Sequence, residues 1–178
     1  MRKFCLTIIV LAGFSKALFA QFGNCTASEM QTYTDRETGN TITILTDTLK
    51  NDRFLYQTDP MWTHDGKYLL FRSSSRANDK KIERTLPNGE KRSWTPTQIY
   101  FIEMATGQII QATEGPDLGS AFLANKSNRM FISRKEKEDW NMYVMDLDKF
   151  FADVKKGKVG KPTAYETLLG TFPTSMGR

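Results

Sequence analysis

The chain has 178 residues, which is enough for one domain of ordinary size. Hydrophobic residues make up 39% and aromatic residues 12% of it, a composition that excludes a largely disordered chain. The formal net charge is +5, but residues 1–20 hold three basic and no acidic residues. The remainder has 22 basic against 20 acidic residues, so its charge gives no reason to expect nucleic acid as a partner.

Residues 1–20, MRKFCLTIIVLAGFSKALFA, have the plan of a secretory signal peptide. A basic start precedes an apolar run from Phe4 to Phe14, and a short segment follows that ends in Ala20. The run is shorter than the about 20 apolar residues that a spanning helix needs. We therefore expect a periplasmic or secreted protein with no stable membrane insertion after cleavage. An uncleaved membrane anchor is the alternative.

Cys25 is the only cysteine outside this segment, which excludes an intrachain disulfide in the cleaved chain. The sequence FGNC before and at this cysteine lacks the apolar and small residues of a lipid-attachment site. An unpaired cysteine near the N-terminus is therefore favoured over a lipid anchor.

The first half of the chain shows strand patterns separated by turns. Residues 21–37 are polar and threonine-rich and are interpreted as an N-terminal linker. Strands are expected at 41–47, 54–62 and 67–74, with a tight turn at 64–66 that ends in Gly66.

The stretch 76–96 is charged, contains Pro-Asn-Gly and has no clean period, which predicts a surface hairpin or loop. A strand–turn–strand pattern follows over 97–115. Further strands are expected in SAFLANKS, RMFISRKE, WNMYVMDLD and AYETLLG. One helix is expected at 147–157, because four apolar residues recur there at helical spacing before a glycine.

The chain repeats itself with a period near 43 residues. IYFIEM begins at Ile99 and MYVMDL at Met142, an offset of 43. KYLL at 67–70 aligns with RMFI at 129–132 at an offset of 62, and the excess falls in the 76–96 insertion. A partial third copy aligns TITILTD with IIQATEG, each after a Thr-Gly turn. Four-stranded repeats of about 40–45 residues are typical of β-propeller blades.

The fold class predicted is all-β, a partial β-propeller after a signal peptide. We expect about two to three four-stranded blades of a seven-bladed propeller, with blades near 41–115 and 116–170 inside a propeller region spanning 38–178. A closed ring needs at least four blades. The 178 residues are therefore expected to be the front part of a longer protein, with missing C-terminal blades. Assembly of several short chains into one ring is the alternative.

YQTDPMWTHDGKYLLFRSS followed by QIYFIEMATGQIIQATEG resembles the oligogalacturonate lyase family of pectin-degrading β-propeller enzymes. The shared pattern is an aromatic-rich strand, Asp65-Gly66-Lys67, an apolar strand, and a strand–Thr-Gly–strand hairpin that closes in Thr113-Glu114-Gly115. The same segments are similar, more loosely, to TolB-type propeller repeats. The resemblance covers roughly residues 38–150.

This resemblance implies β-elimination in short galacturonate oligomers, an acidic oligosaccharide as the partner, and Mn²⁺ in the full-length family member. The family binds its metal with histidines and a glutamine that come from later blades. This chain has one histidine, His64, so no catalytic or metal-binding residue is carried over to it. His64 itself is interpreted as an exposed turn residue.

Four residues are candidates for substrate binding. Arg72 and Arg134 share one position in the 62-residue alignment, and an arginine fork suits a uronate carboxylate. Pairing with a neighbouring acid is the alternative for each. Tyr56 and Gln57 lie on the strand expected at 54–62, next to the channel of a propeller, with packing as the alternative. The three tryptophans are expected to pack between blades rather than to stack on sugars.

The sequence therefore predicts the N-terminal part of an exported oligogalacturonate lyase-like protein that is inactive by itself. The alternative is a non-catalytic TolB-like propeller that binds a protein partner in the cell envelope.

Overall fold

A computed structural model describes residues 22–77, 81–86, 88–115, 118–137 and 139–173 of the chain. The predicted signal peptide, 1–20, lies outside the described residues. The elements run in the order β1 (Cys25–Thr26), β2 (Gln31–Thr34), β3 (Thr41–Ile44), β4 (Asp52–Arg53), β5 (Tyr68–Ser73), β6 (Ile82–Thr85), β7 (Lys91–Trp94), β8 (Gln98–Glu103), β9 (Ile109–Gln111), β10 (Leu118–Leu123), β11 (Arg129–Glu136), β12 (Asp139–Asp146), α1 (Leu147–Lys155), a 3₁₀ turn (Pro162–Ala164) and β13 (Glu166–Pro173).

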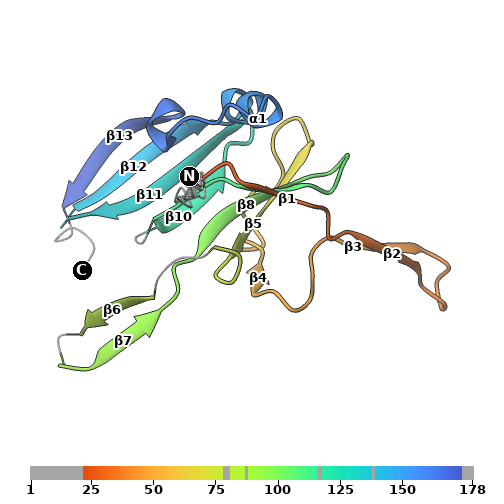
Figure 1. The fold of residues 1–178 in the computed structure, drawn as a ribbon, viewed down its shortest axis with the longest axis horizontal. Coiled ribbons are helices and arrows are strands. Elements are labelled where there is room, and N and C mark those ends of the chain that lie inside the picture. Colours follow the sequence, from red (N-terminus) through yellow and green to blue (C-terminus); the bar gives the residue numbers. More distant parts are fainter. Residues whose placement is uncertain (1–21, 78–80, 87, 116–117, 138, 174–178) are drawn as a thin grey trace, which may run out of the picture.

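Two larger antiparallel sheets form the body of the molecule (Figure 1). The first sheet has the order β1-β9-β8-β5-β4, and the second sheet is the meander β10-β11-β12-β13. Both are open within the described residues, because each edge strand pairs on one side only. The all-β prediction is confirmed, and two successive open antiparallel sheets fit a propeller-like arrangement.

The turn before β5 forms as its sequence predicts. Gly66 has φ = +70°, and its N–H donates to the carbonyl of Thr63 at 2.8 Å. Asp65 accepts hydrogen bonds from the Thr63 hydroxyl and the Lys67 N–H, which closes the turn with side chains as well as backbone. This geometry starts β5 in register with β8.

The core fills the space between the two sheets. Leu70, Ile99 and Phe101 of the first sheet and Met130 and Ile132 of the second are almost completely buried in one cluster. At about 25 cal/mol per Å² of apolar surface removed from water, burial of this kind is the main contribution to stability.

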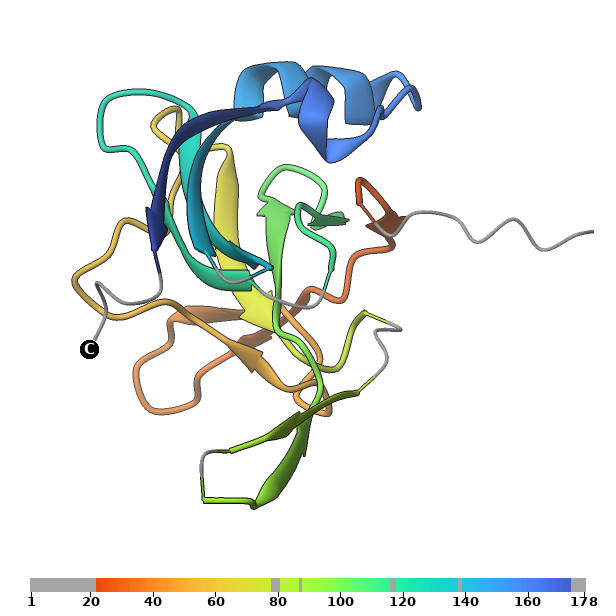
Figure 2. The ribbon, with the colours of Figure 1, turned by 90° about the vertical axis from the view of Figure 1, so that its left-hand side faces the viewer.

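The helix α1 closes one end of this core, opposite the β6–β7 hairpin (Figure 2). Asp146 caps its N-terminus by accepting from the N–H of Lys149, as a good N-cap does. Its apolar face, predicted from the spacing of Phe150, Phe151 and their neighbours, is buried. The Phe151 ring stacks on Tyr68 of β5 with ring centroids 3.6 Å apart, so α1 ties the second sheet to the first. The described residues hold no helix that is long and apolar enough to cross a membrane.

Two segments differ from the elements expected from sequence. The interval 21–37, interpreted as a linker, contains β1, which pairs with β9, and β2, which pairs with β3. The interval 54–62, expected to be a strand, forms a turn in which the N–H of Asp59 donates to the carbonyl of Tyr56. Pro60 explains the difference, because it lacks the N–H that a ladder requires. Tyr56 and Gln57 therefore do not lie on an inner strand.

The register of the repeat also differs from the 62-residue alignment. Phe71 pairs with Tyr100 in the first sheet, and Ile132 pairs with Tyr143 in the second. Since Tyr100 and Tyr143 are 43 residues apart, the equivalent of Phe71 is Ile132, at an offset of 61. Arg72 and Arg134 are therefore not equivalent, and the expectation that they share one position is wrong.

A slip of one residue moves a side chain to the other face of its sheet. The front face is defined here as the one that carries Leu70 and Phe101 in the first sheet, and the back face as the one that carries Phe71 and Tyr100. The register makes Phe131 and Val144 the front face of the second sheet. The core lies between the front face of the first sheet and the back face of the second.

Candidate functional site

A cavity of about 300 Å³ opens between the two sheets at the end away from α1. It is bounded by the turn after β4, the end of β5, the end of β7 and the start of β10. Its wall is formed by Leu55, Tyr56, Asp59, Arg72, Trp94, Pro96, Thr97, Ile99 and Leu118–Ala121. We call it the Arg72 pocket. The sequence predicted two of these residues, Tyr56 and Arg72, as substrate contacts.

Arg72 is the principal charged group of the pocket. It stands near the end of β5 on the front face, opposite Ile99 of β8, and its side chain is exposed. Its guanidinium has no hydrogen-bond or ion-pair partner within the described part of the chain. An arginine without an internal partner keeps five N–H donors for an external ligand.

The other polar and aromatic groups come from irregular segments. Tyr56 and Asp59 are placed by the turn that Pro60 ends, and the Tyr56 ring is 68% exposed. Trp94 ends β7, where the projecting hairpin rejoins the body, and is 38% exposed. Asp59 was not singled out from sequence. An acid in a turn before proline is too common a pattern to mark a site.

Gln57 and Arg134, the other two predicted contacts, lie outside the wall of this pocket. Gln57 is an exposed turn residue. Arg134 forms a two-pronged ion pair with Glu166 of β13, with N–O distances of 3.1 and 2.9 Å. Burial lowers the pKa of Arg134, but the hydrogen bond to Glu166 and the nearby negative charges of Glu166 and Glu136 together raise it above its usual value. The geometry agrees with the alternative that Arg134 pairs with an acid of its own sheet.

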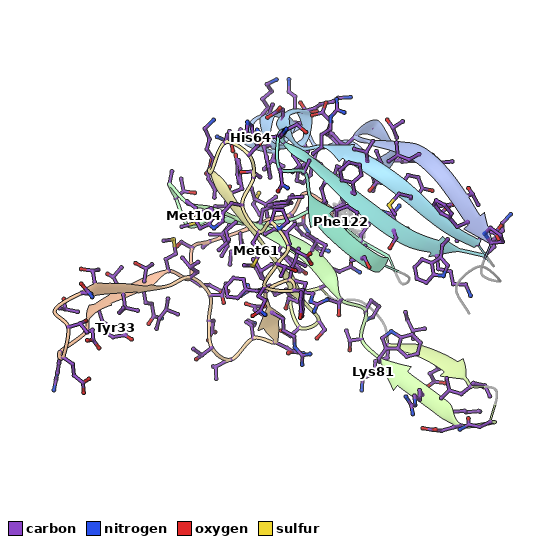
Figure 3. All side chains as sticks on the ribbon, turned by 180° about the vertical axis from the view of Figure 1, so that it is seen from behind. Tyr33, Met61, His64, Lys81, Met104 and Phe122 are labelled. Atoms are coloured by element: carbon purple, nitrogen blue, oxygen red, sulfur yellow. The ribbon has the colours of Figure 1, made fainter. Side chains whose placement is uncertain are left out.

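Metal ligands are not gathered in this structure. No group of three or more His, Cys, Asp or Glu side chains that could hold a metal ion occurs among the described residues. His64 lies at the turn before β5, beside α1 (Figure 3), with its Nδ1 3.1 Å from the carbonyl oxygen of Asn125. The described residues therefore do not fit a manganese site.

A larger open hollow of about 980 Å³ lies between β1 and the end of α1. The Nζ of Lys155, on its wall, lies 2.9 Å from Oε1 of Glu103. The hydrogen bond from Lys155 holds the pKa of Glu103 below its usual value. Lys155 is thus already paired, whereas the Arg72 pocket offers an unpaired cation beside two aromatic rings. The Arg72 pocket is therefore the better candidate for ligand binding.

Comparison with known proteins places the fold. No protein-family model and no curated protein sequence matches the chain. Among solved structures, it is similar to an oligogalacturonate lyase in complex with manganese, with 23% identity and a TM-score of 0.52. It is also similar to an oligogalacturonate lyase from Vibrio parahaemolyticus, with 23% identity and a TM-score of 0.51. Each match covers 72% of this chain and 29% of the other.

The chain shares its fold with oligogalacturonate lyases. The resemblance drawn from Asp65-Gly66-Lys67 and the Thr-Gly hairpin is confirmed at this level. The chain spans less than a third of the length of these oligogalacturonate lyases, and the manganese belongs to the first of those structures.

The Arg72 pocket combines a cation, hydrogen-bond acceptors and aromatic rings. A guanidinium can bind a carboxylate through two parallel hydrogen bonds. The Asp59 carboxylate and Ser120 hydroxyl, both on the wall, can accept hydrogen bonds from sugar hydroxyls. The rings of Tyr56 and Trp94 offer flat apolar faces next to these groups.

Proposed function

We propose that this chain binds oligogalacturonate in the Arg72 pocket, as part of an exported lyase-like propeller. The observation that carries the proposal is the unpaired guanidinium of Arg72 on a wall it shares with Tyr56 and Trp94. Periplasmic or secreted location follows from the signal peptide predicted at 1–20. In this proposal the chain is the front part of a longer protein.

The charge pattern of the substrate matches the pocket. Each galacturonate unit carries one carboxylate and several hydroxyls, so it presents one anion for Arg72 and donors for Asp59 and Ser120. A charge-assisted hydrogen bond contributes about 1.5–3 kcal/mol, more than one between neutral groups. Neutral galactose oligomers lack the anion and would meet Asp59 without the compensating contact at Arg72. The pocket should therefore prefer the acid.

The β-elimination of the family would need a base near the sugar proton alpha to the carboxylate and a cationic centre to hold the charge that develops there. Arg72 fits the role of the cationic centre, because its guanidinium can bind the carboxylate of the sugar. The described residues bring no histidine next to it, since His64 is at the other end of β5. We therefore propose binding for this chain and assign the chemical step to residues that it does not carry.

The test is calorimetric titration of the purified chain with trigalacturonate and with the neutral galactose trimer. We expect heat of binding for the acid alone. Arg72→Ala should weaken binding by roughly tenfold to a hundredfold, the equivalent of one charge-assisted contact. Arg92→Ala is the matched control, because Arg92 is an exposed arginine on β7 that pairs with Glu90 and lies off the pocket wall.

Equal binding of both trimers, or wild-type affinity in Arg72→Ala, would refute the proposal. In that case the alternative from the sequence, a non-catalytic propeller that binds a protein partner, becomes the better description.

A further inference from the structure

A second arginine stands directly opposite Arg72. The short edge strand β4 pairs with β5, and its register places Arg53 opposite Arg72 (Figure 1). Directly opposite residues of an antiparallel pair point to the same face, with Cβ atoms about 4.5–5.5 Å apart. Both side chains are exposed. The front face of the first sheet therefore carries two neighbouring arginines at its edge.

The neighbours of Arg53 along the chain indicate the same face. Asn51, two residues earlier, donates from Nδ2 to the hydroxyl of Ser74 at 2.7 Å, and Ser74 lies two residues beyond Arg72. Leu55, two residues later, packs against the core between the sheets, which lies on the front side of the first sheet. In an extended segment, side chains two residues apart share a face. Arg53 therefore points to the front, beside the Arg72 pocket.

The guanidinium of Arg53 is oriented but not neutralised. Its Nε donates to Oδ1 of Asn51 at 3.3 Å, and Asn51 is itself held by hydrogen bonds to Ser74 and Ser75. Within the described part of the chain Arg53 makes no other hydrogen bond, and no carboxylate pairs with it or with Arg72. The N–H groups on the two terminal nitrogens of Arg53 therefore remain for an external acceptor.

Two less exposed arginines of the chain differ from this pair, because each has an acidic partner. Arg76 pairs with Glu29 and Asp52, and Arg134 pairs with Glu166. Like charges directly opposite each other in an antiparallel pair are destabilising. An arginine pair without an acid therefore costs stability in the free protein, and an anion bound over both arginines would relieve that cost. This arrangement favours an anionic ligand.

We propose that Arg53 and Arg72 bind the carboxylates of two successive galacturonate units. This inference rests on the proposed function, because it takes the Arg72 pocket as the place of the first unit. The second unit lies over the β4 edge, with its carboxylate on the terminal nitrogens of Arg53. Each arginine can bind one carboxylate through two parallel hydrogen bonds. The site therefore selects oligomers of at least two uronates over the single sugar acid.

Calorimetric titration of the purified chain with galacturonate and with digalacturonate tests this pairing. The wild type should bind the dimer more tightly than the single sugar acid, by roughly tenfold or more. Arg53→Ala should lose that gain, because its affinity for digalacturonate falls by roughly tenfold to a hundredfold, whereas Arg72→Ala should bind both ligands more weakly. Arg92→Ala is the matched control, since Arg92 also stands opposite an arginine, Arg84, but pairs with Glu90. It should bind both ligands like the wild type.

The thermal stability of the free protein provides a second readout. Because Arg53→Ala removes a like-charge contact, the variant should melt at the wild-type temperature or slightly above it at low ionic strength. Salt at about 1 M should abolish any difference, since it screens interactions between exposed charges. A melting temperature below that of the wild type at both ionic strengths would make Arg53 a structural residue and would overturn its assignment to the ligand.

The titrations distinguish failure of this inference from failure of the proposed function. Wild-type affinity of Arg53→Ala for digalacturonate, with weakened binding in Arg72→Ala, would remove the second contact and leave the proposed function intact. Equal affinity of the wild type for the two ligands would do the same. Wild-type affinity in both variants, or no binding of either ligand, would refute the proposed function as well. Equal losses in Arg92→Ala and Arg53→Ala would indicate non-specific attraction of anions and would also overturn the inference.

Discussion

Arg72 and Arg134 show how the face of a strand decides the role of one residue type. Both lie near the end of the second strand of a repeat, and the 62-residue alignment placed them at one position as substrate-binding candidates. Arg72 is on the front face and without a partner, whereas Arg134 is on the back face and bound by Glu166, over the ring of Tyr143. The first is available for a ligand and the second holds β11 to β13.

Arg134 should therefore matter for stability. Glu166 is 3% exposed, so Arg134→Ala would leave a buried carboxylate without its cation. We expect the free energy of unfolding to fall by about 3 kcal/mol, the low end of the range for a broken buried pair. Denaturant titration measures this free energy. Arg129→Ala is the control, because Arg129 is an exposed arginine on the same strand, and it should change the free energy of unfolding by less than about 0.5 kcal/mol.

A double variant separates the charge from the packing. Arg134→Met with Glu166→Leu removes both charges and keeps apolar volume, so it should recover most of the lost stability. If Arg134→Ala unfolds at the wild-type denaturant concentration, the ion pair is not structural, and a role in ligand binding regains support.

At the scale of elements, the N-terminal segment is tied to the first sheet by a three-residue network. The Arg76 guanidinium, after β5, donates to Glu29 before β2 at 2.9 and 2.6 Å and to Asp52 of β4. Glu29 also accepts from the N–H of Asp47 at 2.8 Å. Arg76 is 7% exposed, so these contacts are largely shielded from water. The network fixes the base of the projecting β2–β3 hairpin.

This network makes the stability depend on pH. The hydrogen bond from Arg76 lowers the pKa of Glu29 from 4.5 to about 2. Because the pKa is lower in the folded state, the stabilisation is complete above about pH 4.5 and is lost as the pH falls toward 2. Glu29→Gln should be less stable than the wild type at pH 7, and the difference should shrink between pH 5 and 3. Urea unfolding at these pH values measures it.

Glu37→Gln, at the exposed tip of the same hairpin, is the control and should leave the pH profile unchanged. A constant difference between Glu29→Gln and the wild type at all three pH values would show that Glu29 acts through its shape and not through its charge.

Most elements could be predicted from local patterns, and the misses have physical causes. β5, β8, β12 and α1 fall where alternation, apolar runs and helical spacing indicated them. The register of β5 could not be predicted, because Tyr68–Phe71 are apolar at every position and buried on both faces. Offsets of 61 and 62 each align three of these four residues with apolar residues of the second copy. The pairings of β1 and β2 depend on partners distant in sequence, which no local pattern contains.

At the scale of the whole molecule, two sheets and a helix share one core, and the sheets leave unlike surfaces at the two ends of the stack. One is the apolar front face of the second sheet. The other is the back face of the first, where Phe71, Tyr100 and Ile102 are buried with Leu45 packed against them. The Arg72 pocket lies between the sheets, so the relation between adjacent sheets creates the candidate site as well as the core. The sequence identified Arg72 and Tyr56, but Trp94 and Asp59 join them only through the packing of irregular segments.

Binding and catalysis can be measured separately in this chain. Although its fold is that of lyases, its single histidine is engaged with the carbonyl of Asn125, and the described residues gather no set of metal ligands. We expect trigalacturonate to bind with the same affinity with and without Mn²⁺, and no unsaturated product to form above a protein-free control in either case. Ultraviolet absorbance of the unsaturated product and calorimetry measure the two quantities. Product formation that a chelator abolishes would contradict the prediction, and would require a metal site that includes residues outside the described ranges.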